Sequence, residues 1–250
     1  MAVSWFYLME ELGTLQMIKI LYAFVLALAA WPVVAGIPVE ETVECPWEFG
    51  RAKITSTLSC SSRGGEVYLD GSQPSSCEFV TVLPVCSKHA LPLYTKFKKG
   101  DEKLLRTIVK REEYQALLQR TRFERAFFVD QSLQRLRKGD RFFLLLSGYH
   151  SEPQRTYGDA DYGALFRQAY NDYLPEMEAE DKPWLVAAAA YVQLRLGKVD
   201  KARKLLQWVR RNPGKQGKYV LRYVAAVERC LTRTQDKSCA PKTVLQLDRD

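Results

Sequence analysis

Two short cysteine motifs carry the residue types best suited to chemistry: C-P-W-E at 45–48 and C-S-K-H at 86–89. In each motif a second potential metal ligand follows the cysteine after two residues, a spacing that lets both side chains of a pair face one zinc ion. Together they offer zinc two thiolates, a carboxylate and an imidazole, from Cys45, Glu48, Cys86 and His89. If the two motifs lie side by side, the sulfurs of Cys45 and Cys86 are also close enough to bond to each other.

The chain has six cysteines, and an even number behind a predicted export signal favours disulfides in an oxidising compartment. Sequence alone leaves the connectivity open. Besides the two motif cysteines, one pair flanks a predicted central strand and another encloses eight residues near the C-terminal end. The expected pairs are Cys45–Cys86, Cys60–Cys77 and Cys230–Cys239. Zinc held by Cys45, Cys86 and His89 is the alternative, and no other cofactor is expected.

Residues 1–35 are predicted to be an export signal. The residues before Met17 carry two glutamates and no basic side chain, whereas a signal peptide begins with positive charge, so Met17 is the expected initiator. Lys19 then precedes the apolar run 20–30, and small side chains up to Ala35 predict cleavage after that residue. An uncleaved anchor helix is the alternative, because the run is close to the minimum length of a membrane span. The expected location is periplasmic or secreted.

The cysteine-rich residues 43–98 are predicted to form a β ribbon. Three segments have the composition of strands, 52–58, 66–69 and 78–85, and clusters of Ser, Gly and Pro separate them. The simplest arrangement is a three-stranded antiparallel ribbon. Because a sheet this small does not stabilise itself, it depends on disulfides, a metal or the helices that follow.

Residues 99–231 are predicted to form a helical domain, and residues 232–250 a tail. Several segments have apolar residues at i, i+3, i+4 and i+7, as in Ala187, Ala190, Tyr191 and Leu194. This periodicity and the start and stop signals predict helices at 101–109, 113–118, 121–136, 142–149, 160–178, 183–196, 199–211 and 219–231. The predicted fold class is therefore α+β, a small β ribbon followed by a mostly helical bundle.

Residues 183–213 resemble a tetratricopeptide repeat, in which two helices form a hairpin. A tryptophan precedes an alanine-rich helix, a glycine makes the turn, a small residue follows in the second helix and a proline closes the unit. The residues that carry the resemblance are Trp184, Tyr191, Gly197, Ala202 and Pro213. Only one repeat is complete, so the resemblance implies a bundle of repeat-like hairpins rather than a long superhelix.

The chain from about residue 43 to residue 231 also resembles an uncharacterised bacterial family, domain of unknown function 2225. The matching features are C-P at 45–46 with Gly50, L-P-V-C at 83–86, A-L-P-L-Y at 90–94, and Phe97. The resemblance implies a zinc-ribbon-like module followed by tetratricopeptide-like helices, and it implies no known activity. Family members with complete motifs have cysteine where this chain has Glu48 and His89, so the ribbon is degenerate.

The formal net charge of +8 is unevenly distributed along the chain. Residues 195–234 hold twelve Lys or Arg against two acidic residues, whereas residues 151–182 hold eight acidic residues against three basic ones. These segments are either neighbouring helix faces that attract each other or a basic surface for an acidic protein or an anionic membrane. The candidate partner-binding cations are Arg203, Arg210, Arg211, Lys218 and Arg222. Nucleic acid is not an expected partner of an exported protein.

No motif typical of an enzyme is present in the sequence. The chain has two histidines, no nucleophile elbow, no phosphate-binding glycine loop and no metalloprotease motif. We therefore expect a protein without enzymatic activity, and specifically an exported protein-interaction or assembly module of the bacterial cell envelope. A metal-holding accessory protein is the alternative function, and an enzyme of unrecognised type is the third.

Overall fold

The computed structural model describes residues 36–62, 64–215 and 217–247. The predicted export signal, with the expected initiator Met17, lies outside these residues. Internal contacts divide the chain after Ala35, and every described residue belongs to the second unit, Gly36–Asp250. Among the described residues, no helix combines the length and the apolar character that a membrane span requires.

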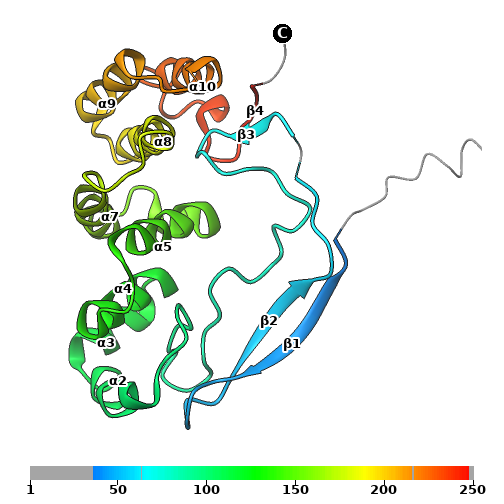
Figure 1. The fold of residues 1–250 in the computed structure, drawn as a ribbon, viewed down its shortest axis with the longest axis vertical. Helices are drawn as coiled ribbons and strands as arrows, with labels where there is room; N and C mark the ends of the chain where they lie inside the picture. Colours follow the sequence, from blue (N-terminus) through cyan, green and yellow to red (C-terminus); the bar gives the residue numbers. More distant parts are fainter. Residues whose placement is uncertain (1–35, 63, 216, 248–250) are drawn as a thin grey trace, which may run out of the picture. The chain divides into compact units, whose positions relative to one another are not determined.

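Helices make up about half of this unit, and they stack in chain order from α2 to α10 (Figure 1). Their bounds are α2 (Glu102–Ile108), α3 (Glu112–Ala116), α4 (Arg122–Leu133), α5 (Lys138–Ser151), α6 (Pro153–Thr156), α7 (Ala160–Tyr173), α8 (Lys182–Arg195), α9 (Val199–Arg211) and α10 (Gly217–Arg229). Helices α8 and α9 pack side by side, and only residues 196–198 separate them in the chain. The predicted helical part of the α+β fold is confirmed.

Local sequence explains where several helices begin and end. The side chain of Asp159 accepts a hydrogen bond from the Tyr162 N–H at 2.8 Å, which caps the start of α7. That helix ends at Tyr173 and not at residue 178 as predicted, because Pro175 has no N–H to continue the hydrogen-bond ladder. Pro153 is the first residue of α6, a position at which a backbone N–H would have no acceptor within the helix.

The last helices differ in how much of their surface they bury. Helix α8 is buried nearly all round, and its alanines at 187–190 let neighbouring elements approach closely. Helix α9 buries one stripe, formed by Ala202, Leu206 and Val209, and turns its charged residues outward. The α9 stripe is one that the sequence predicts, whereas the predicted apolar residues of α8 are buried as part of a helix that is buried on nearly all sides.

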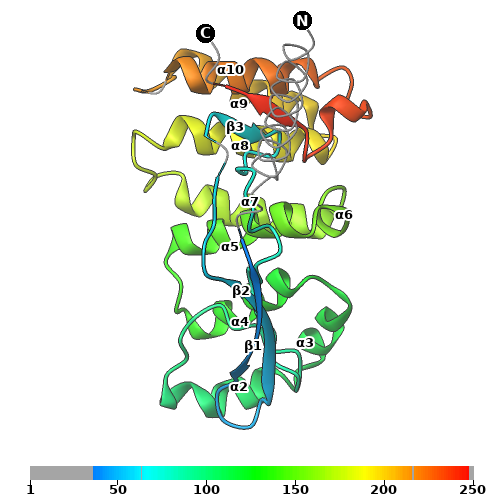
Figure 2. The same cartoon turned by 90° about the vertical axis from the view of Figure 1, so that its right-hand side faces the viewer.

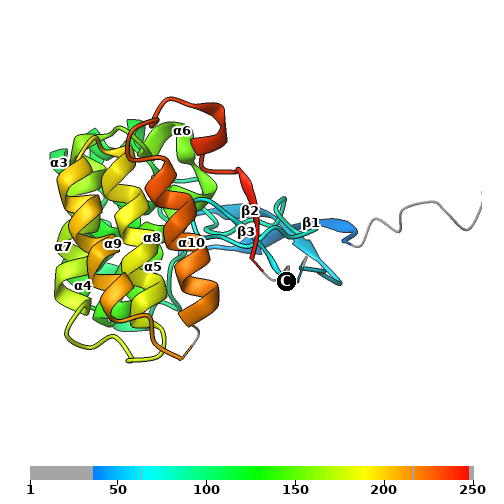
Figure 3. The same ribbon diagram turned by 90° about the horizontal axis from the view of Figure 1, so that it is seen from above.

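The strands form two separate two-stranded antiparallel sheets. Strand β1 (Pro38–Glu44) pairs with β2 (Arg51–Thr57) over their full lengths, with Pro38 opposite Thr57 and Glu44 opposite Arg51. Strand β3 (Glu66–Tyr68) pairs with β4 (Val244–Gln246), which comes from the predicted tail. Figure 3 shows the helices gathered on one side and the β1–β2 ribbon on the other.

The predicted three-stranded ribbon is therefore not formed. Residues 78–85, the expected third strand, lie in turns and extended coil that follow the outer edge of β2. The N–H of Thr81 donates to the carbonyl oxygen of Thr55 at 2.9 Å, but Val80 closes a turn onto Cys77 and Pro84 has no N–H to donate. Strand β1 also begins before the predicted module boundary at residue 43.

Two apolar cores hold the unit together. The larger core joins α4, α5 and α7–α10 to β3, and it includes Leu69 near the N-terminal end and Leu247 near the C-terminal end. The smaller core joins Phe49 and Leu91 to residues of α2–α4 such as Tyr114. Both cores combine residues from the predicted ribbon module and from the helical domain, so each part is stabilised by the other.

Three disulfides link the six cysteines, Cys45–Cys86, Cys60–Cys77 and Cys230–Cys239. They are the three pairs that the sequence predicts. The first lies in the smaller core, the second joins the end of the β1–β2 ribbon to the coil that follows β3, and the third links the end of α10 to the returning tail. Three native disulfides indicate an oxidising environment outside the cytoplasm.

Candidate functional site

The residues of the two cysteine motifs lie together, but not as a metal site. The sulfurs of Cys45 and Cys86 are bonded to each other, so in this state neither is a thiolate that zinc could bind. The carboxylate of Glu48 accepts a hydrogen bond from Arg106 at 3.3 Å, and the ring of His89 lies edge-on to Phe49 with centroids 6.0 Å apart. Within the described ranges, no group of three or more His, Cys, Asp or Glu is placed to hold a metal ion.

The cations predicted to bind a partner lie on the neighbouring helices α9 and α10, and several have partners within the protein. Arg203 pairs with Asp200 at 2.9 Å, and Arg210 donates from Nε to Glu228 at 2.8 Å. Arg222 donates to the carbonyl oxygen of Leu247. Arg211 and Lys218 are exposed. Intramolecular pairing thus neutralises part of this predicted surface.

A different basic cluster lines a groove of about 690 Å³ between the β1–β2 ribbon and the helices. We call it the arginine groove. Its lining comes from both strands, from the coil that follows β3, from α4 and from α6: Thr42, Arg51, Lys53, Thr81, Val85, Ser87, Arg122, Arg125 and Arg155. Five of these described residues are cationic and none is acidic. The groove therefore has the electrostatic character of an anion-binding site.

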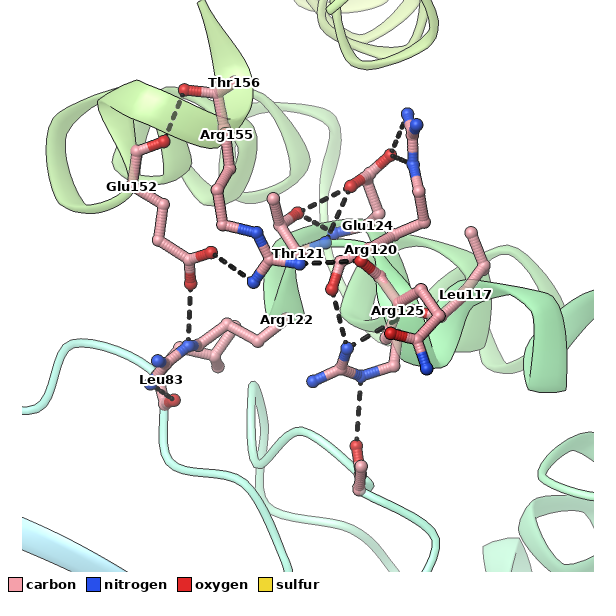
Figure 4. Close-up of polar contacts among 12 residues, drawn as sticks. Leu83, Leu117, Arg120, Thr121, Arg122, Glu124, Arg125, Glu152, Arg155 and Thr156 are labelled. Atoms are coloured by element: carbon pink, nitrogen blue, oxygen red, sulfur yellow. Dashed lines mark hydrogen bonds and ion pairs between the residues drawn. The ribbon is translucent and has the colours of Figure 1, made fainter.

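A capping box fixes the start of α4 and with it two of the arginines. The N–H of Glu124 donates to the hydroxyl oxygen of Thr121 at 3.2 Å, and the Glu124 carboxylate accepts from the Thr121 N–H at 2.9 Å (Figure 4). Arg120 donates to the same carboxylate at 2.9 Å. Because Arg122 and Arg125 are three residues apart in the helix that follows, they lie on the same face.

Arg125 is the buried cation of the groove, with 7% of its surface exposed. Its guanidinium donates to the carbonyl oxygens of Arg120 at 2.9 Å, Ala90 at 3.2 Å and Leu117 at 3.3 Å (Figure 4). Burial lowers the pKa of this group and is the largest effect; the charge of Glu152 raises that pKa, and the positive charges of Arg122 and Arg155 lower it. In the part of the chain that the structure describes, no carboxylate accepts a hydrogen bond from it. An anion in the groove would therefore compensate a buried positive charge.

Glu152, at the end of α5, already shows how a carboxylate binds here. It accepts from Arg122 Nε at 2.9 Å and from Arg155 Nη1 at 3.3 Å, so one side chain bridges two arginines (Figure 4). Both arginines are also held by carbonyl oxygens, Arg122 by Leu83 at 3.2 Å and Arg155 by Gln119 at 2.8 Å. The guanidinium groups are thus positioned before any ligand arrives.

The ribbon side of the groove is more open. Arg51 pairs with Glu44 at 2.7 Å, but both side chains are about 70% exposed, and such a pair contributes little. Lys53 is exposed and forms no ion pair with any described residue. The hydroxyl of Ser87 accepts a hydrogen bond from the Arg51 N–H at 3.2 Å, which keeps the coil against the strand. The groove therefore has one rigid wall on α4 and α6 and one adaptable wall on β2.

The sequence reasoning missed this site because the five cations come from residues far apart in the chain. The run R-T-R-F-E-R at 120–125 is the local signal that could have found it, since it combines three arginines with the start of a helix. The second half of the site, Arg51 and Lys53, follows only from the fold.

No protein-family model matches this chain, and comparisons with curated proteins and with solved structures give no match either. The resemblances to tetratricopeptide repeats and to the uncharacterised bacterial family therefore stay predictions from the motifs. The function of the groove has to be inferred from its own geometry.

Proposed function

We propose that this protein is an exported binding module of the bacterial cell envelope, and that it docks an acidic segment of a partner protein in the arginine groove. The observation that carries this proposal is the guanidinium of Arg125, which is buried at the groove with carbonyl oxygens as its hydrogen-bond acceptors. A buried cation is stabilised by an anion that reaches it. The three disulfides support an extracytoplasmic location.

The groove chemistry favours carboxylates presented by a polypeptide. Planar guanidinium groups bind carboxylates with two parallel hydrogen bonds, which fixes the orientation of the bound group. The hydroxyl groups of Thr42, Thr81 and Ser87 lie among the cations and can bond the backbone of an extended chain. A cavity of about 690 Å³ has room for a few amino-acid residues. The expected ligand is therefore a short stretch with two or more Asp or Glu.

The test is binding of a fluorescent glutamate-rich peptide to the full chain, measured by anisotropy at low and moderate salt. The variant Lys53→Glu with Arg155→Gln lowers the charge of the groove while Arg125 keeps its structural contacts. We expect its Kd to rise at least about tenfold, and a peptide with Gln in place of Glu to bind no better than background.

The matched control is Lys201→Glu with Arg211→Gln, which makes the same charge change on the exposed side of α9. Its affinity for the peptide should equal that of the unmodified protein. Equal losses in both variants would show a general charge effect and contradict the proposal, as would unchanged binding in the groove variant.

A further inference from the structure

A second concentration of positive charge surrounds α2, at the end of the helical stack farthest from α9 and α10 (Figure 2). Two adjoining hollows mark it, one of about 640 Å³ over α2 and one of about 170 Å³ between α2 and the second cysteine motif. Arg106 and Lys110 line both hollows. The five cations that line them come from three segments of the chain: Lys88, Lys99, Lys103, Arg106 and Lys110. We call these five residues, with Leu104, the α2 patch.

Most of this charge has no partner within the described part of the chain. The two carboxylates that line the hollows, Glu48 and Glu102, both pair with Arg106, at 3.3 and 2.8 Å. The four lysines form no ion pair with any described residue. The α2 patch is thus a positive surface that intramolecular pairing leaves uncompensated, unlike the paired cations Arg203 and Arg210 of α9.

An exposed apolar side chain, Leu104, adjoins the lysines at Lys103. Leu104 follows Lys103 on the outer side of α2 and is 36% exposed. It is one of few large apolar side chains that the described residues expose on a helix. Leu104 lies at the margin of α2, between the outward-facing Lys103 and the inner face that buries Leu105 and Ile108, and an exposed leucine next to a lysine can enter a lipid headgroup layer.

We propose that the α2 patch docks this protein on an anionic phospholipid surface, with the lysines at the phosphates and Leu104 between the headgroups. Its chemistry differs from that of the arginine groove. Lysine ammonium groups are flexible point charges, suited to the irregular array of phosphates on a bilayer, whereas buried, fixed guanidinium groups recognise one ligand geometry. The α2 patch is also open on the outer side of α2, so a flat surface can reach it.

The experiment is sedimentation of the full chain with vesicles of phosphatidylcholine alone or with 30 mol% phosphatidylglycerol, at about 50 and about 150 mM salt. We expect binding to the anionic vesicles and none to the neutral ones, with weaker binding at the higher salt. Each basic residue close to an anionic surface contributes roughly fivefold to partitioning, so Lys99→Glu, Lys103→Glu and Lys110→Glu together should reduce binding at least about 100-fold.

The matched control carries the same change of charge at the other end of the stack, as Lys201→Glu, Lys204→Glu and Arg211→Glu in α9. It should retain most of the vesicle binding. A second variant, Leu104→Ser, leaves the charge unchanged and should weaken binding about threefold if the leucine enters the headgroup layer.

Three outcomes would overturn the inference. The first is that the protein does not bind the anionic vesicles. The second is that the α2 and α9 variants lose vesicle binding equally. The third is that soluble polyglutamate binds the α2 patch while vesicles do not, which would make the partner an acidic protein. Circular dichroism of each variant shows whether the helices are intact, so loss of the fold is distinguishable from loss of docking.

Discussion

Tyr223 in α10 donates its hydroxyl to the carbonyl oxygen of Leu69, next to β3, at 2.9 Å across 154 residues of chain. Both residues are buried. This hydrogen bond, the β3–β4 pairing and the larger core join the two halves of the chain into one folded unit. The predicted ribbon module is thus held in place by the helices, and the C-terminal tail returns to complete its second sheet.

Replacing Tyr223 by Phe tests this link. The change leaves the buried carbonyl of Leu69 without its partner, which should lower the free energy of unfolding by about 1 to 3 kcal/mol. Urea unfolding followed by circular dichroism gives the difference. The control is Tyr149→Phe, because Tyr149 is buried and its hydroxyl has no hydrogen-bond partner within the described residues. An equal loss in both variants would mean that the link does not contribute.

The Cys230–Cys239 disulfide should hold the returning tail. It closes a loop with a sequence separation of 9, and its removal by a double substitution to Ala should lower stability by about 3 kcal/mol. We also expect faster hydrogen exchange at Val244–Gln246, because β4 depends on the position of the tail. The comparison is the double variant Cys45→Ala with Cys86→Ala. Because this disulfide has a sequence separation of 41, its removal should lower the free energy of unfolding by about 4 kcal/mol. Strand β4 should keep its protection from hydrogen exchange in this variant. Loss of protection in both would contradict a local role.

The sequence predicts the parts of this fold that local patterns determine. Helix α8, the apolar stripe of α9 and the three disulfide pairs belong to this class. Pairing between strands that are distant in the chain cannot be predicted from local patterns. Strand β1 was missed because it is acidic and almost wholly exposed, so it has no apolar face, and β4 was missed because a three-residue strand in a tail gives no periodic signal. Residues 78–85 have the composition of a strand, but the turn onto Cys77 and Pro84 interrupt their pairing with the outer edge of β2.

Only part of the candidate site can likewise be predicted from the sequence. The run at 120–125 is visible in the sequence, but its position next to Arg51, Lys53 and Arg155 depends on how the ribbon and the coil after β3 pack against α4 and α6. The zinc alternative rested on the ligand types and spacing of the two motifs, and neither distinguishes a metal site from a disulfide between the same two cysteines. Oxidation of Cys45 and Cys86 to one bond is what separates the two in the structure.

Glu152 should act as an internal competitor for the ligand of the arginine groove. Its carboxylate bridges Arg122 and Arg155, so a bound acidic peptide has to share or displace it. The variant Glu152→Gln removes the negative charge and keeps the side-chain shape, and we expect the glutamate-rich peptide to bind about fivefold more tightly. Calorimetric titration measures the change. Weaker binding would show that Glu152 positions the arginines for the ligand instead of competing with it.

His150 should make the stability of the protein depend on pH. Its ring nitrogen Nε2 lies 3.2 Å from the carbonyl oxygen of Asp70, and burial lowers the pKa of the ring below its ordinary value. The nearby Asp70 raises that pKa and Lys242 lowers it, but burial is the largest effect. The neutral ring is therefore the form that the folded state favours.

The sign of the effect follows from proton binding. As the pH falls below about 6.5, the unfolded chain takes up a proton at His150 more readily than the folded protein does, so the free energy of unfolding falls with pH. One proton limits the slope to about 1.4 kcal/mol per pH unit. Urea unfolding between pH 7.5 and 5.5 should show this slope, and His150→Gln should remove it because glutamine can still donate to Asp70 without titrating. The matched control is His89→Gln, which replaces an exposed ring and should leave the pH dependence unchanged. If the pH dependence persists in His150→Gln, another group causes it.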